Sequence, residues 1–236
     1  RQERREACHQ PGRARHGEGL PPVPVKNVYA ADRDPNLLAY AAIDMARAFA
    51  TLWDTPYGPP PPLQLSLEAI LETDPIEEWV ENIYLDRSQL RPGKPLEISV
   101  KLRRNDGPAS FERFTIQVPH AWANDEVQFV AVGGELAEAI GFEVHGVPRP
   151  TELPQVAKWL AKRPDQGHLY LLAIRRGVGM TAGVDALQFL PPTVVAQLSG
   201  DFSRQERALG VAWEDKRQRP GIVQGGAGAL VSVLAQ

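Results

Sequence analysis

The chain has 236 residues, of which 43% are hydrophobic and 23% charged, a composition typical of a globular protein. Its 26 basic and 29 acidic residues leave a net charge of −3, which argues against a general nucleic-acid binder. The single cysteine, Cys8, excludes an internal disulfide and cysteine-built zinc or iron–sulfur sites. No apolar run reaches the ~20 residues of a membrane span. The 22 prolines and 20 glycines favour short strands joined by turns.

The N-terminal stretch, residues 1–24, is predicted to be a flexible or partner-binding arm. It is polar, contains five arginines and shows no periodicity. Because the chain begins with Arg1 rather than methionine, we expect a fragment or a processed product, and we find no signal peptide in this stretch.

Residues 25–58 are predicted to form a strand followed by a helix. Residues 25–33 alternate as a strand does, and Asp34 with Pro35 is typical of a helix start. The helix is expected to run to about Trp53 and to pack its apolar stripe on a sheet. The stripe consists of Leu37, Leu38, Ala41, Ala42, Met45, Phe49 and Leu52. The proline-rich residues 54–62 then predict a stiff linker at a domain boundary.

The middle of the chain, residues 63–147, is predicted to form an immunoglobulin-like antiparallel β-sandwich. Its strongest signal is a strand at 96–103 in which apolar and charged or polar residues alternate strictly, followed by a turn and a return strand at 111–118. Ile98, Val100, Phe114 and Ile116 are expected on one buried face, with Glu97, Lys101 and Gln117 outside. Further strands are expected at 63–71, at 79–85 with Trp79, Ile83 and Leu85 as apolar anchors, and at 126–132.

The C-terminal part, residues 148–236, is predicted to be a smaller α+β region. Thr151 is expected to cap a helix that Pro164 ends. We then expect a strand at 168–175, a glycine-rich loop at 177–183, a short helix from Pro191 to Gly200, and closing strands at 211–213, 222–223 and 230–234. The whole chain is therefore predicted to be mainly β with α+β flanks.

The chemistry-bearing residues match no catalytic pattern, so we predict no catalytic, cofactor-binding or metal-binding residue and no cofactor. The histidines lack metal-binding spacing and the serines lack a nucleophile elbow. Residues 177–183 lack the following helix that a dinucleotide needs, and the acidic pairs are expected to face solvent. The sequence leaves open a site assembled from side chains on distant strands. The residues weighed are His9, His16, His120, His145 (expected after a strand), His168, Ser88, Ser110, Ser199, Ser203, Glu77 with Glu78, and Asp32 with Asp34.

Several segments together resemble a known family. They are the Leu90–Arg91–Pro92–Gly93 turn with the strands that end at Arg103 and at Val118–Pro119, and the stretches 28–52, 160–164, 169–174, 190–194 and 223–226. Across residues 25–236 they resemble the region that follows the catalytic domain in bacterial proteins related to the stage IV sporulation protein B serine peptidase. The family's serine stands in a glycine-rich turn of a preceding domain, and no position here matches that motif.

The resemblance implies a non-catalytic accessory or protein-binding module of an exported bacterial peptidase-like protein, located outside the cytoplasm. We expect a protein partner or an upstream peptidase domain, no nucleic acid, no transmembrane segment, and no peptidase activity in the isolated chain. Two alternatives stay open. One is a processed chain of a serine peptidase whose catalytic serine lies outside this sequence. The other is a structural subunit of an extracellular assembly, a homo-oligomer joined through the arm 1–24.

Overall fold

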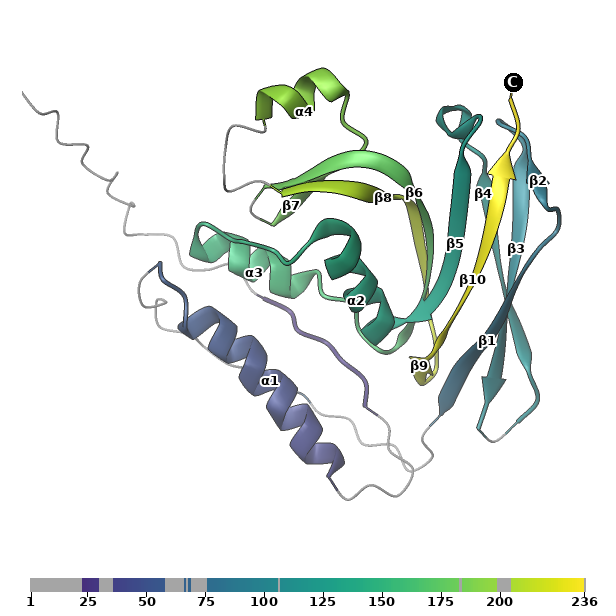
Figure 1. Cartoon of the computed structure of the whole chain (residues 1–236). Coiled ribbons are helices and arrows are strands. Elements are labelled where there is room, and N and C mark those ends of the chain that lie inside the picture. The colour runs from purple at the N-terminus through teal and green to yellow at the C-terminus, as the bar shows by residue number, and fades with distance from the viewer. Residues whose placement is uncertain are drawn as a thin grey trace, which may run out of the picture.

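Two β-sheets packed face to face form the body of the protein, and helices cover the far side of one of them (Figure 1). The computed structural model describes residues 23–29, 36–57, 66, 68, 76–105, 107–182, 184–198 and 205–235. This part of the chain is a β-rich α+β fold with mixed sheets. None of its helices is both long enough and apolar enough to cross a bilayer.

The first sheet, sheet A, has the strand order β4–β3–β1–β9. The predicted hairpin is confirmed, because β3 and β4 pair antiparallel with Ile98 opposite Phe114, and both side chains are buried. Glu97 and Gln117 are exposed on the outer face and Lys101 is half-buried there. The strands span β1 Glu77–Leu85, β3 Pro95–Arg104, β4 Ser110–Gln117 and β9 Ile222–Gln224.

The second sheet, sheet B, has the order β2–β10–β5–β6–β7, and β8 also pairs with β6. The pairs β1–β9 and β2–β10 are parallel, which differs from the antiparallel sandwich expected of residues 63–147 alone. The predicted closing strands are confirmed in β8, β9 and β10, and two of them join sheets formed by residues 77–133. The strands span β2 Gln89–Leu90, β5 Glu126–Gly133, β6 His168–Ala182, β7 Asp185–Leu187, β8 Gln205–Gln218 and β10 Gly226–Val233.

The main core lies between the two sheets. Alternate residues of β3 and β4 meet alternate residues of β5 and β6 there, and Trp122 of the short 3-10 helix His120–Trp122 closes one end against Phe129. The opposite face of sheet B is also apolar. Val132, Tyr170 and Leu172 on that face are buried under a helix, so sheet B is covered on both sides.

That covering helix, α2 (Gly134–His145), is absent from the sequence-based expectations. It follows β5 without a break, and its Ala137 and Val144 pack on sheet B. Gly146 has φ of 81° and ψ of 167°, a backbone conformation that essentially only glycine adopts, and its N–H bonds to the carbonyl of Phe142 as the helix ends. His145 is therefore the last residue of a helix, and the expectation that it follows a strand is wrong.

The predicted helix before Pro164 is confirmed as α3 (Leu153–Ala161), but its cap is not Thr151. Glu152 occupies the N-cap position without a side-chain cap bond. Thr151 instead exchanges two hydrogen bonds with Gln155. The Gln155 amide nitrogen donates to the Thr151 hydroxyl at 3.1 Å, and the Thr151 N–H donates to the amide oxygen. The short helix after Pro191 is confirmed as α4 (Pro192–Leu198).

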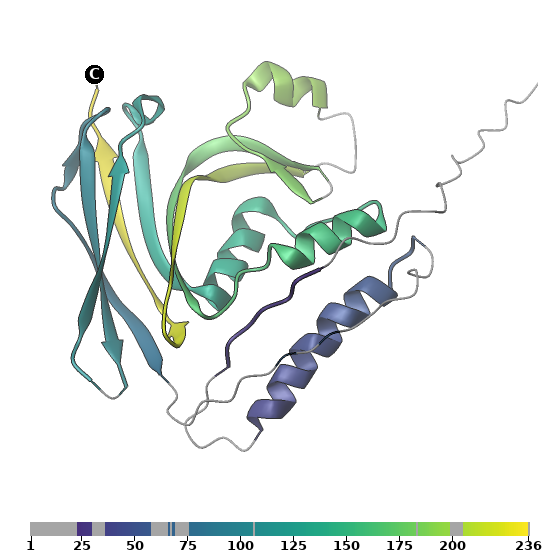
Figure 2. The ribbon, with the colours of Figure 1, turned by 180° about the vertical axis from the view of Figure 1, so that it is seen from behind.

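Helix α1 (Leu37–Trp53) confirms the predicted helix but not its packing. It lies against α3 rather than a sheet. Of the α1 side chains whose burial the structure describes, Ala48 and Leu52 are the buried ones, and they pack with Val156, Ala157 and Leu160 of α3. Residues 23–29 run between α1 and α3 (Figure 2). They form no ladder with any described strand, so the expected strand at 25–33 is wrong over this range. The hydrophobic period of a helix does not specify what covers it.

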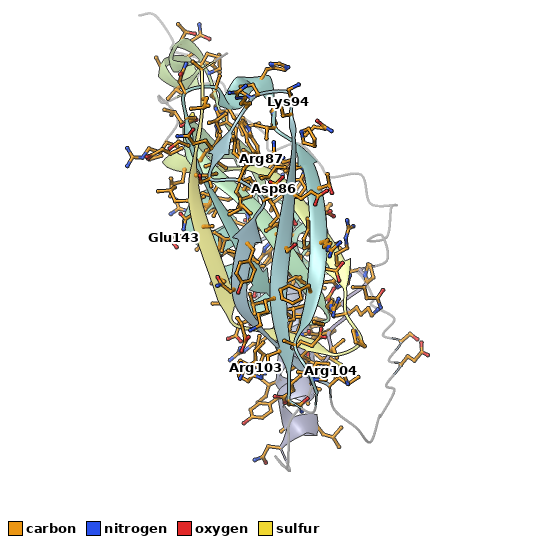
Figure 3. All side chains as sticks on the ribbon, turned by 90° about the vertical axis from the view of Figure 1, so that its right-hand side faces the viewer. Asp86, Arg87, Lys94, Arg103, Arg104 and Glu143 are labelled. Atoms are coloured by element: carbon orange, nitrogen blue, oxygen red, sulfur yellow. The ribbon has the colours of Figure 1, made fainter. Side chains whose placement is uncertain are left out.

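A β-bulge in β1 makes the predicted anchor Trp79 point outward. The register with β3 shifts between Val80 and Asn82, so that Val80 and Ile83 both face the core. Trp79 is 45% exposed on the outer face of sheet A, opposite Arg103. Figure 3 looks onto this face and labels Arg103 and Arg104 at one end of β3.

The glycines expected in a loop at 177–183 lie mostly inside β6. A Cβ at Gly177 would stand 2.4 Å from the Phe189 ring, and one at Gly179 would stand 2.8 Å from the Leu187 carbonyl oxygen. These glycines therefore allow a close approach of the chain after β7, and the predicted loop is wrong through Ala182. Residues 1–22 of the expected arm 1–24, the expected cap Asp34 and the expected strand 63–71 lie outside the described residues, apart from the single positions 66 and 68. The predicted domain boundaries, which divide the chain into residues 1–24, 25–58, 63–147 and 148–236, stay a prediction.

Candidate functional site

Five side chains from four segments meet where α1, α2 and α3 approach one another. We call them the junction cluster: Asn27, Tyr29, Asp44, Glu138 and Arg163. The Arg163 guanidinium donates to both carboxylate oxygens of Glu138, at 2.7 and 3.2 Å. Its Nη1 lies 3.6 Å from Asp44 on α1. The cluster is therefore the polar link between α1 and α2.

Asp44 is the centre of the cluster. Its carboxylate accepts hydrogen bonds from the Tyr29 hydroxyl at 2.5 Å and from the Asn27 amide at 3.0 Å. The Asn27 side-chain oxygen in turn accepts the N–H of Gln166, at 3.1 Å. Residues 23–29 are thereby held on one side by α1 and on the other by the turn after α3.

Electrostatics in the cluster favour a charged Asp44 and a neutral Tyr29. Burial raises the pKa of Asp44, but hydrogen bonds from Tyr29 and Asn27 and the charge of Arg163 outweigh it, so the pKa lies below its ordinary value. Burial, helped by the bond to Asp44, raises the pKa of Tyr29 to about 12. The bonds to Glu138 raise the pKa of Arg163 despite its burial. Each charge of the cluster therefore stabilises its neighbours, which is the arrangement of a structural clamp.

A hollow of about 530 Å³ opens beside the cluster between the three helices. Arg47, Thr51 and Asp54 line it from α1, and Phe142 and Trp159 line it from α2 and α3. Its walls combine charged groups with two aromatic rings, and it is open to solvent. An open, mixed surface of this kind suits contact with another protein better than enclosure of a small substrate.

A different face of α1 from the one at the hollow carries a row of exposed apolar side chains, which we call the α1 stripe: Leu38, Met45, Phe49 and Trp53. They recur at helical spacing, and Leu38 and Trp53 are 68% and 56% exposed. The Phe49 and Trp53 rings stack with their centroids 5.7 Å apart. Asp44 and Arg47 are the only charged residues of α1. A helix that is apolar on nearly all sides is normally buried, so the α1 stripe is a candidate docking surface.

The histidines and serines do not assemble a catalytic or metal site within the described residues. His120 lies in the 3-10 helix, His145 ends α2 and His168 begins β6. No three His, Cys, Asp or Glu side chains of the described part could hold a metal ion. Ser88 is exposed in the turn after β1 and Ser110 begins β4. His9, His16, Ser199 and Ser203 fall outside the described residues, as do Asp32 and Asp34.

One histidine is paired with a carboxylate. The Nδ1 atom of His168 lies 2.7 Å from Asp165, which also accepts the N–H of Gly167 at 2.9 Å. The Tyr170 hydroxyl accepts the Asp165 N–H at 3.1 Å. Of the serine, threonine and cysteine side chains that the structure describes, none bonds to His168. The pair therefore holds the turn between α3 and β6, and it lacks the nucleophile of a triad.

The acidic pair Glu77–Glu78 shows where sequence reasoning missed a buried site. Glu78 is 1% exposed, which contradicts the expectation that it faces solvent. Arg219 donates to its two carboxylate oxygens at 2.7 and 2.9 Å and to Glu112 at 2.5 Å. Arg219 lies 141 residues away in the chain, so no local pattern reports this contact. The junction cluster was missed for the same reason, although a lone Asp44 in an apolar helix is a signal of an inward polar contact.

Comparison of the chain with protein-family models, with curated proteins and with solved structures finds no match.

Proposed function

We propose that this chain is a non-catalytic protein-binding module, an accessory part of an exported bacterial peptidase-like protein. The α1 stripe is the observation that carries the proposal. Fully burying one exposed large apolar side chain contributes about 1.5–3 kcal/mol, and Leu38, Met45, Phe49 and Trp53 leave part of that contribution unused in the chain alone. The occupant we propose is the apolar surface of the peptidase domain that the family resemblance predicts.

The clamp of the junction cluster supports the same proposal. It fixes α1 to the body by Asp44, Arg163 and Tyr29, so the α1 stripe is presented on a helix whose inner side is held. A preorganised surface binds with a smaller ordering cost than a loose one. The hollow on another side of α1 offers charged groups of the kind found in the polar rim of protein interfaces.

The immunoglobulin-like character of the sandwich and the extracytoplasmic location belong to this proposal. The β3–β4 hairpin and the core between two sheets support the first, while the parallel pairs β1–β9 and β2–β10 give the sheets their own topology. The second is supported by the family resemblance alone. Cell fractionation of the native host, with detection of this chain outside the cytoplasm, tests it.

Site-specific photo-crosslinking tests the docking surface. A photoreactive phenylalanine analogue at Phe49 in the α1 stripe should form an adduct with a peptidase-like protein, identified by mass spectrometry. The same analogue at Thr115, exposed on the outer face of sheet A, is the matched control and should not. Phe49→Ser should weaken the complex while Thr115→Ser should not. Adducts only between copies of this chain, or equal adducts from both positions, would overturn the proposal.

A second candidate, a contribution to a serine peptidase cleft, is favoured by the Asp165–His168 pair. The pair has the carboxylate–imidazole distance that a triad uses, 2.7 Å. If a serine from another chain completed the site, His168→Gln would abolish fluorophosphonate labelling of the complex. We expect labelling of the complex to be unchanged, because the Asp165 carboxylate already serves the backbone of its own turn.

A further inference from the structure

A half-open pocket lies between α2 and α3, beyond the hollow that adjoins α1. It measures about 200 Å³, and Val184, Ala186 and the end of α2 form part of its wall. Most of its wall is apolar, with Phe142, Trp159, Pro148 and Val184 prominent. Apolar cavities of about 150 Å³ accept a molecule as large as benzene. This pocket therefore has room for one large apolar group and is smaller than the ~300–1,000 Å³ of a drug-sized ligand site.

A glycine in the middle of α2 keeps the pocket open. Gly141 lines it, and a Cβ built at Gly141 meets no atom within 4 Å. Gly133 and Gly134 differ, since a Cβ there would stand 1.9 and 2.1 Å from backbone oxygens. A glycine inside a helix costs about 0.5–1 kcal/mol relative to alanine, and packing does not require one at Gly141. Its effect is to leave this wall of the pocket bare.

Two of the cationic side chains around the pocket are already paired with carboxylates within the protein. Arg163 is held by Glu138, and Lys158 donates to both oxygens of Asp185 at 2.9 and 3.0 Å. The buried side-chain atoms without a hydrogen-bond partner in the described residues do not lie in the lining. A ligand here is therefore not needed to complete a hydrogen bond. With Lys162 also in the wall, positive charge is in excess, which disfavours a cationic group.

We propose that this pocket binds one uncharged apolar group of the size of a leucine or phenylalanine side chain, contributed by the protein partner that docks on α1. The inference rests on the proposed function for the source of the group. It rests on continuity as well, because Glu138, Phe142, Trp159 and Arg163 line both the hollow and the pocket. Because Arg47 and Thr51 of α1 also line the hollow, a partner that covers the hollow against α1 reaches the pocket through these shared residues.

Fluorine NMR of the protein labelled with 5-fluorotryptophan tests the pocket without the partner. The resonance of Trp159, assigned with Trp159→Phe, should shift on titration with indole and with N-acetyl-leucine methylamide. Leucine amide, which is cationic, should bind more weakly. An unchanged Trp159 resonance at millimolar concentrations of both neutral probes would overturn the inference.

Two substitutions on α2 provide matched variants. Gly141→Leu should fill the pocket and lower the affinity for both neutral probes at least about 10-fold, with an unchanged or higher melting temperature because the helix loses a glycine. Glu143→Leu adds the same side chain at an exposed position of the same helix (Figure 3) and should leave the affinity within about twofold. Val184→Trp fills the same space from the opposite wall and provides a second blocked variant.

The outcomes separate this inference from the proposed function. Probe binding that Gly141→Leu and Val184→Trp both leave unchanged would show that the probes bind elsewhere, and would overturn the inference. If the probes do not bind but crosslinking at Phe49 succeeds, the inference about the pocket is overturned and the proposed docking surface is retained. Probe binding that is blocked by Gly141→Leu, without crosslinking at Phe49, would confirm the pocket chemistry and overturn a partner as its source.

Discussion

At the scale of single residues, the buried charge of Glu78 is the most consequential feature of the fold. Its carboxylate is enclosed at the end of sheet A and depends on Arg219, in the turn between β8 and β9, for both of its oxygens. Glu112 on β4 binds the third nitrogen of the same guanidinium. Removing one partner of a buried pair leaves an uncompensated charge, which costs more than the pair itself contributes.

Arg219→Ala should therefore lower the free energy of unfolding by about 3–5 kcal/mol, measured by urea denaturation at pH 7. Arg87→Ala, which removes an exposed arginine paired with Asp86, should change it by no more than about 1 kcal/mol. The double variant Glu78→Met with Arg219→Met should recover most of the loss, because no buried charge is left. An equal effect of the two single alanine variants would contradict this role of Arg219.

The core register at Val100 provides a second test at this scale. Val100 is fully buried between the sheets, whereas its neighbour Ser99 faces outward, opposite Arg113. Val100→Asp should cost more than about 3 kcal/mol because it buries an unpaired charge. Ser99→Asp should stay within about 0.5 kcal/mol. Thermal unfolding of both variants checks the prediction, and a near-native melting temperature of Val100→Asp would refute the register.

At the scale of elements, the attachment of α1 depends on the charge state of the junction cluster. The pKa of Asp44 is depressed in the folded protein. The stability that its charge contributes to the fold is therefore fully present above the ordinary pKa of 3.8, and it is lost as the pH falls through the folded pKa. The pKa of Tyr29 is raised to about 12. The stability that its neutral hydroxyl contributes to the fold is therefore present below the ordinary pKa of 10.0, and it is lost as the pH rises towards 12.

Asp44→Asn should for this reason be destabilising only in part of the pH range. At pH 7 we expect a loss of roughly 1.5–3 kcal/mol, the range for hydrogen bonds to charged groups. The difference in melting temperature from the unsubstituted protein should shrink as the pH falls below 3.8. Asp54→Asn at the exposed end of α1 is the control and should stay within about 0.5 kcal/mol. A difference that does not change with pH would show that the charge of Asp44 does not hold α1.

The elements differ in how far the sequence predicts them. The β3–β4 hairpin and α3 were predictable because strict alternation and helical spacing are local signals. In β1 a bulge between Val80 and Asn82 reverses the alternation, so the sequence pattern predicts the wrong face for Trp79. Helix α2 follows β5 without a capping side chain at Gly133 and therefore lacks a start signal.

The candidate site was less predictable than the elements that build it. The α1 helix and its apolar residues are evident from the spacing, but whether α3, a sheet or a partner covers them depends on tertiary packing. The contacts of Asn27 with Gln166 and of Arg163 with Glu138 join residues 139 and 25 positions apart. Sequence patterns over ten or twenty residues do not report such pairs, and the open wall at Gly141 is visible only in three dimensions.

At the scale of the whole molecule, the N-terminal residues divide into two parts with different roles. Val23 packs against the α1–α3 core, and Asn27 and Tyr29 hold Asp44, so residues 23–29 belong to the fold (Figure 2). The arm ahead of them has few apolar side chains with which to offset about 1–2 kcal/mol of backbone ordering per residue. Its five arginines suit acidic groups on a partner or a neighbouring copy.

Deleting residues 1–22 should therefore leave the melting temperature of the dilute protein within a few degrees, while weakening any assembly seen by sedimentation. Deleting residues 1–29 removes the bonds to Asp44 as well and should cost about 3 kcal/mol, which corresponds to roughly 6–12 °C in a protein of this size. Lys26→Ala, at an exposed position of the same segment, is the control and should have little effect. Equal losses from the two deletions would show that the arm before Val23 is part of the fold and that the contacts of Asn27 and Tyr29 contribute nothing further.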